Sequence, residues 1–137
     1  MIGALLQGQM CPGNGLFMVK ATVLNKVQTA DLGPHVLKAT SSTPGQTEVS
    51  YTVWEGDGAR TGVWEATPGT FTSTREGFNE VCVILSGTAT ITDDSGSFDI
   101  GPGSLFVTPA GWRGSWTVHE TLRKVGFVQN LPVQVAS

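Results

Sequence analysis

Two glycine-punctuated stretches decide the fold of this chain: residues 69–87, GTFTSTREGFNEVCVILSG, and residues 103–117, GSLFVTPAGWRGSWT. The first contains a near-continuous apolar run at 79–85, short and rich in Val and Ile, which is typical of a central strand buried on both faces. We expect Gly87 to end that strand. In the second stretch, residues 105–108 have strand composition, and the Pro-Ala-Gly sequence at 109–111 indicates a corner.

The rest of the chain also predicts short strands separated by turn residues. Residues 48–54 alternate polar and apolar side chains with a period of two, and the glycine-containing segments 55–58 and 93–96 are typical hairpin turns. No segment carries an apolar stripe at helical spacing over three turns. Even spacing of short strands is typical of a β-sandwich or barrel. The ten expected strands are 18–23, 36–40, 48–54, 61–66, 79–85, 88–92, 97–100, 105–108, 114–119 and 122–128, the last two forming a hairpin around 120–121.

The length and composition suit a single β-rich domain. The chain has 137 residues and 18 glycines, and 14% of its residues are charged, well below the usual value of about 25%. We expect residues 1–17, which are apolar and glycine-rich, to be a flexible or strand-exchanging arm, and residues 18–137 to form one domain. Two cysteines, Cys11 and Cys82, are too few for a disulfide framework.

Charge and hydropathy exclude two classes of partner. The net charge of −3 argues against nucleic-acid binding, which needs a basic stripe, and no apolar stretch is long enough to span a membrane. We therefore expect a cytoplasmic protein. We also expect a homodimer, because the outer strands of a barrel leave edges that need cover and the arm at 1–17 could be exchanged.

The two stretches resemble the two sequence motifs of the cupin barrel. Glu80 followed by six residues and Gly87 matches the end of the first motif, and Gly103, Pro109 and Gly111 match the spacing of the second. Across residues 49–128 the chain is similar to small single-domain cupins of the DUF861 type, related to the cupin domain of ureidoglycine aminohydrolase. The segments that carry this likeness are 62–69, 80–87, 109–116 and 123–125. The resemblance implies an all-β cupin fold, that is, a double-stranded β-helix or jelly-roll barrel.

The metal ligands of the cupin motifs are largely missing. The two histidines expected near 73–76 are absent, the expected second-motif His is Gly114, and the expected Asn is Val118, so that Glu80 alone remains. His35 and His119 lie outside the motifs. Because an iron or manganese centre usually needs two His and a carboxylate on one side, we expect no metal and no other cofactor.

Strand parity places the candidate site around Glu80. If Glu80 points inward, as its motif position implies, Cys82 and Ile84 share its face, because strand side chains alternate. We expect a buried Glu80 to need a partner, and Arg75 is the first candidate. The residues expected to bind a ligand are Tyr51, Trp64, Arg75, Glu80, Cys82, Trp112 and Trp116, with Glu80 as the tentative catalytic group.

Three functions are compatible with these features. The first is binding of a small polar organic molecule in the barrel without a transition metal. The second is an enzyme, which uses Glu80 as acid or base or resembles a metal-dependent aminohydrolase or isomerase cupin through ligands that the motifs do not reveal. The third is a non-enzymatic dimeric scaffold or regulator, whose barrel is filled by its own side chains. The sequence leaves all three open.

Overall fold

Eight β-strands form the regular structure of residues 19–132, the part of the chain that the computed structural model describes, and this part contains no helix. No helix in it is therefore long and apolar enough to cross a membrane. The strands are β1 (Val36–Leu37), β2 (Thr47–Gly56), β3 (Ala59–Ala66), β4 (Gly69–Thr74), β5 (Phe78–Asp93), β6 (Gly96–Ile100), β7 (Leu105–Thr108) and β8 (Arg113–Asn130).

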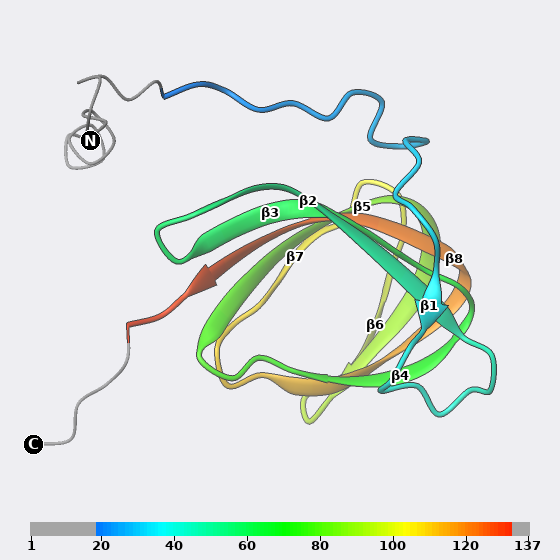
Figure 1. Ribbon diagram of the computed structural model, residues 1–137. Coiled ribbons are helices and arrows are strands. Elements are labelled where there is room, and N and C mark those ends of the chain that lie inside the picture. The colour runs from blue at the N-terminus through cyan, green and yellow to red at the C-terminus, as the bar shows by residue number, and fades with distance from the viewer. Residues whose placement is uncertain (1–18, 133–137) are drawn as a thin grey trace, which may run out of the picture.

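The strands pair in one antiparallel sheet that curls into a barrel (Figure 1). The strand order is β1-β2-β3-β8-β5-β6, with β4 also pairing with β8 and β7 with β5. Because β8 pairs with β3 through one half of its length and with β4 through the other, it belongs to both walls. The all-β barrel expected from the sequence is confirmed.

Two long strands replace four of the short ones that the sequence predicts. β5 and β8 pair from Phe78↔Asn130 to Thr92↔Ser115, and the register shifts between Ile84 and Ala89. The prediction that Gly87 ends a strand is therefore wrong, and so is the predicted hairpin at 120–121. Gly87 instead bends β5: its φ is +85°, and a Cβ there would lie 2.0 Å from the carbonyl oxygen of Thr121.

Three further differences lie outside the long strands. Residues 19–23 form no strand, and only Val36–Leu37 of the expected 36–40 strand is paired. β4, which the strand pattern did not predict, pairs with β8 over its whole length. Its sequence, Gly69–Thr74, contains one large apolar residue, Phe71, among threonines and a serine, so that periodicity gives it little signal. The arm expected at 1–17 lies outside the described residues.

An aromatic cluster fills the centre of the barrel. Trp116 is 1% exposed and stacks on Phe71 with ring centroids 5.6 Å apart, while Trp64 meets both rings edge-on at 5.9 Å. Offset and edge-to-face contacts of this kind stabilise aromatic cores beyond the area that they bury. The buried core is completed by Cys82, Ile84, Ala89, Ile91, Ile100, Val118 and Leu122.

The segment before β1 runs across the outside of the barrel and is drawn in blue in Figure 1. Arg123 of β8 attaches it, because the guanidinium donates hydrogen bonds to the carbonyl oxygens of Val27 (3.0 Å) and Ala30 (2.9 Å). Arg123 also pairs with Glu65 of β3 at 2.9 Å, and Leu32 is buried nearby in the chain. Charged side chains on the outer face therefore hold this segment.

The bend at Gly87 gives a prediction about stability. Gly87→Ala should destabilise the fold more than Gly77→Ala, although both glycines have φ values near +80°, because nothing lies within 4 Å of a Cβ at Gly77. The left-handed conformation alone costs about 1–2 kcal/mol for alanine, and the backbone clash at 87 should add about 1–3 kcal/mol. Urea unfolding of both variants measures the difference. Equal losses would show that β5 and β8 can separate at the corner without cost.

Candidate functional site

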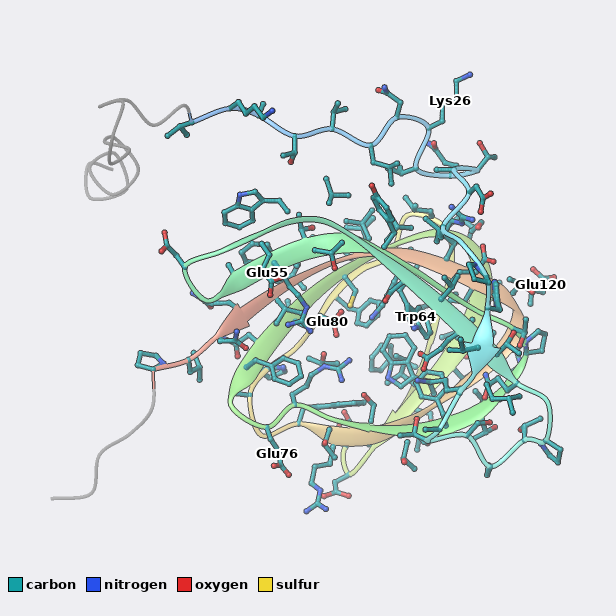
Figure 2. The ribbon with its side chains drawn as sticks, viewed as in Figure 1. Lys26, Glu55, Trp64, Glu76, Glu80 and Glu120 are labelled. Carbon is teal, nitrogen blue, oxygen red and sulfur yellow. The ribbon has the colours of Figure 1, made fainter. Side chains whose placement is uncertain are left out.

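A cavity of about 240 Å³ opens into the barrel beside the aromatic cluster. Its wall combines the aromatic rings with charged groups from β3, β5 and β8, from the loop between β1 and β2, and from the loop after β4. Figure 2 shows Glu80 and Trp64 inside the ring of strands and Glu76 and Glu120 outside it. The lining residues are Lys38, Ser50, Tyr51, Thr52, Arg60, Thr61, Gly62, Val63, Trp64, Phe71, Ser73, Arg75, Glu80, Trp116, Lys124, Gly126 and Val128.

Glu80 is held between two cations. Its Oε1 lies 2.8 Å from Nη2 of Arg75, and its Oε2 lies 3.0 Å from Nζ of Lys124. The three side chains are 13%, 8% and 7% exposed, respectively. Both carboxylate oxygens therefore already have a charged partner, and the expected Glu80–Arg75 contact is present together with a second one that the sequence analysis did not anticipate.

The register of β5 and β8 explains how these groups meet. Glu80 pairs with Val128, Cys82 with Gly126 and Ile84 with Lys124, so these inward-facing residues form three successive rows. Lys124 reaches diagonally across the row of Gly126 to Glu80. Gly126 makes room for this contact, because a Cβ there would lie 2.6 Å from Oε2 of Glu80.

Arg75 is fixed by hydrogen bonds on every side of its guanidinium. Nε donates to the hydroxyl of Thr108 at 2.9 Å, and Nη1 donates to the hydroxyl of Ser73 and to the carbonyl oxygen of Thr74. Thr108 lies opposite Glu80 in the β5–β7 pairing. With the contact from Nη2 to Glu80, four of the five N–H donors of the guanidinium are engaged, so Arg75 keeps its position and orients Glu80.

Lys124 lies among aromatic rings. Its Nζ is 4.9 Å from the ring centroid of Trp64 and 4.8 Å from that of Trp116, distances at which the ring faces attract a cation. It donates to Glu80 and makes a long contact of 3.5 Å with Sγ of Cys82. The sequence does carry a signal for Lys124, which is a lysine on the same strand face as Leu122, Gly126 and Val128. The predicted site did not include it.

The pKa of Glu80 lies below its ordinary value of 4.5. Burial acts in the opposite direction and would raise the pKa, but the charges of Lys124 and Arg75 and the hydrogen bond from Lys124 outweigh it. Glu80 is therefore an ionised carboxylate near neutral pH. This state suits an electrostatic anchor better than a general acid, which must carry a proton.

Cys82 lies beneath this ion pair and is fully buried. Burial raises the pKa of its thiol, the positive charge of Lys124 opposes that effect, and Glu80 adds to it. Because a thiolate and not a thiol is the nucleophile, Cys82 is a packing residue. It does not line the cavity.

The structure brings together most of the other residues predicted for the site. Tyr51, Trp64, Arg75, Glu80 and Trp116 line the cavity, and Trp112 does not. Trp112 packs against the core, donates its indole N–H to Asp93 at 2.8 Å and places its ring 5.8 Å from the guanidinium carbon of Arg75. Tyr51 alternates with Ser50 and Thr52, which lie opposite Trp64 and Gly62, and it is 47% exposed.

A second ion pair closes the opposite side of the cavity and was not predicted. Nζ of Lys38 lies 2.9 Å from Oε1 of Glu48 and 4.3 Å from the ring centroid of Phe71. The same oxygen of Glu48 accepts the indole N–H of Trp64 at 2.9 Å. Burial raises the pKa of Glu48. The hydrogen bonds from Trp64 and Lys38, together with the charge of Lys38, lower the pKa by more than burial raises it, so that the net shift is downward.

The cavity does not suit a transition metal. Among residues 19–132 no three His, Cys, Asp or Glu side chains converge in a way that could hold a metal ion. The two cations on Glu80 would also repel a metal cation. His35 binds Glu65 and Thr47, and His119 lies beside Thr90, so neither histidine is part of the cavity wall.

The lowered pKa of Glu80 gives a prediction about acid stability. A carboxylate whose folded pKa is below its unfolded pKa adds stability above the unfolded value, and that stability is lost as pH falls through the folded value. Glu80→Gln should cost about 3–5 kcal/mol near neutral pH, because it leaves Arg75 and Lys124 without their counterion. Below about pH 4.5 the difference from the unmodified protein should shrink.

Urea unfolding at a series of pH values measures this difference. Glu120→Gln is the matched control, because Glu120 is exposed, and its curve should follow that of the unmodified protein. Glu48 and Asp93 also have lowered pKa values, so a background loss of stability in acid should remain in all three proteins. Parallel curves for Glu80→Gln and the unmodified protein would contradict the assigned ion pair.

Comparisons with known proteins agree with this fold. None of the curated proteins matches the chain. Among solved structures, the Clostridium difficile EutQ protein superposes with a TM-score of 0.59 at 18% identity, covering 68% of this chain and 75% of that one. The cupin domain of Schizosaccharomyces pombe Cnp3 gives a TM-score of 0.56 at 15% identity, covering 61% of each chain.

A DUF861-family protein of unknown function from Pseudomonas syringae pv. tomato gives a TM-score of 0.62 at 23% identity and covers 74% of this chain. The chain spans 46% of that protein, less than half of its length. At these identities the structural likeness establishes the fold alone. The sequence model of the EutQ-like cupin domain matches residues 55–125, which is just over half of the 137 residues. The chain therefore belongs to the EutQ-like cupin family.

Proposed function

We propose that this cupin binds a small polar organic molecule in the barrel cavity and does so without a transition metal. The observation that carries the proposal is the ion-paired row of Arg75, Glu80 and Lys124 in the wall of an open, aromatic-lined cavity. Ligand sites combine an apolar wall with a few fixed polar groups in this way. A barrel that only needed filling would be more stable with apolar residues in place of buried charges.

The enzyme alternative has less support. Among residues 19–132, Glu80 is the one carboxylate in the cavity wall, and both of its oxygens are engaged by cations. A general base must reach a substrate proton directly or through one water molecule, so Glu80 would first have to leave one of these partners. Binding needs no such rearrangement.

A fragment screen followed by protein NMR tests the proposal. A small polar compound should shift the indole N–H signals of Trp64 and Trp116 in the unmodified protein and in Glu120→Gln. The same compound should leave Glu80→Gln unchanged, because Lys124 loses the group that positions it. The shifts should survive dialysis against a chelator, and elemental analysis should find less than one equivalent of transition metal per chain. Binding that disappears with the chelator and returns with added metal would overturn the proposal.

We also propose that two copies of the chain associate through the outer face of β5, β7 and β8. Val81 of β5 lies between Val107 of β7 and Phe127 of β8, and the last two are 53% and 41% exposed. Leu105, 69% exposed, continues this apolar row. Exposed apolar patches mark interaction surfaces, and an uncharged patch can face a second copy of itself without charge repulsion.

Light scattering coupled to size exclusion tests this association. We expect a dimer for the unmodified protein and a monomer for Phe127→Lys, because a lysine in the apolar row would be buried without a partner in the dimer. Phe98→Lys is the matched control, since Phe98 is similarly exposed, at 44%, but lies on β6, and this variant should remain dimeric. A monomeric unmodified protein at micromolar concentration would refute the proposal.

A further inference from the structure

We infer that the molecule bound in the cavity is an anion, a small carboxylate with an apolar body, and that Lys124 is the residue that binds its carboxylate. This inference rests on the proposed function and specifies the chemical class of the ligand. It follows from the charge, the free donors and the shape of the cavity wall.

The cavity wall is positive although the chain is negative. Among residues 19–132, four cationic residues line it, Lys38, Arg60, Arg75 and Lys124, against one carboxylate, Glu80. Glu48 pairs with Lys38, and Glu55 lies opposite Arg60 in the β2–β3 pairing without forming an ion pair, so the wall itself keeps a positive excess. Since the whole chain has a net charge of −3, the cavity is a local positive region. Concave walls of one sign concentrate ligands of the opposite sign.

Some charged or buried polar groups of the cavity wall can still form hydrogen bonds, and these groups are donors. Lys124 has three N–H donors. It uses one on Glu80 and one, weakly, on Cys82, so that one remains. Arg60 makes no ion pair or side-chain hydrogen bond with any residue between 19 and 132. In the same range Trp116 Nε1 is the one buried side-chain N or O atom without a partner. Donors without acceptors select a ligand rich in acceptors.

Lys124 and Arg60 differ in burial, and they therefore have different roles. Lys124 is 6% exposed and lies against Trp64 and Trp116, so a carboxylate that meets it leaves water and its apolar body rests on those rings. Arg60 is exposed and lies opposite Val128 at the start of β3, so it attracts the anion at the mouth. Glu80 does not contact the ligand in this arrangement. It is a positioning residue that holds Lys124.

Benzoate and benzamide are suitable probes, because they share size and shape and differ in charge. Titration of the full chain, followed by its tryptophan fluorescence, should give a dissociation constant about 10-fold lower for benzoate than for benzamide, which is the difference expected for one charge-assisted hydrogen bond. Raising the salt concentration should weaken benzoate binding and leave benzamide binding unchanged.

Three variants locate the charge that matters. Lys124→Gln should remove the preference for benzoate. Should that variant fail to fold, Arg60→Gln still tests the inference, since exposed Arg60 makes no ion pair or side-chain hydrogen bond with the described residues. It should weaken benzoate binding several-fold at low salt and leave benzamide binding unchanged. Arg113→Gln, an exposed arginine on β8 that does not line the cavity, is the matched control and should bind both probes normally.

The outcomes distinguish this inference from the proposed function. Preference for benzoate that depends on Lys124 or Arg60 supports both. Two outcomes would overturn the inference that the ligand is an anion and leave the proposed binding function standing. One is equal binding of benzoate and benzamide. The other is a preference for benzoate that Arg60→Gln and Arg113→Gln reduce equally. Failure of benzoate, benzamide and inorganic phosphate alike to bind overturns both.

Discussion

The carboxylate of Glu80, held between Arg75 and Lys124, is the constraint on which the rest of this barrel depends. Removing three charged groups from water is costly, and their mutual attraction compensates only if the geometry is fixed and the remaining donors are satisfied. The positions of three segments around β5 are therefore fixed relative to one another. They are the strand that carries Thr108, the loop that carries Arg75 and the strand that carries Lys124. The charges specify how the walls of the barrel meet, whereas the aromatic cluster and the aliphatic residues around it form the buried core.

The same arrangement accounts for the missing metal ligands. In a metal cupin the positive charge of the cavity belongs to a bound ion. Here side chains supply the positive charge. The ammonium group of Lys124 is part of the polypeptide and does not have to be bound from solution, but its orientation is fixed and it has only a few N–H donors. The rings of Trp64 and Trp116 stabilise the Lys124 cation in the cavity wall, where it is largely buried. Under the proposed function, the polypeptide itself supplies the binding chemistry of the cavity.

The sequence predicts the fold well and the site in part, for physical reasons. Glycine and proline spacing and the two-residue period report local backbone conformation, so the barrel and the turns at 55–58 and 93–96 could be predicted. The corner at Gly87 could not, because the identity of its partner, Thr121, depends on pairing between segments far apart in the chain. Glu80 and Arg75 were found from a motif and from proximity in sequence. Lys124 and Lys38 were missed because their roles come from rings and carboxylates on other strands.

Gly126 has a consequence for any attempt to alter the cavity. It is the position opposite Cys82 where even one methyl group would collide with the carboxylate of Glu80. A larger residue in place of Gly126 would therefore also displace the charged carboxylate of Glu80. Conversely, replacing Glu80 would free the space that Gly126 leaves for that carboxylate. Volume and electrostatics are thus coupled at a single backbone position. Redesign for a ligand of another size would have to proceed from the opposite wall, where Ser50 and Thr52 present short hydroxyl side chains.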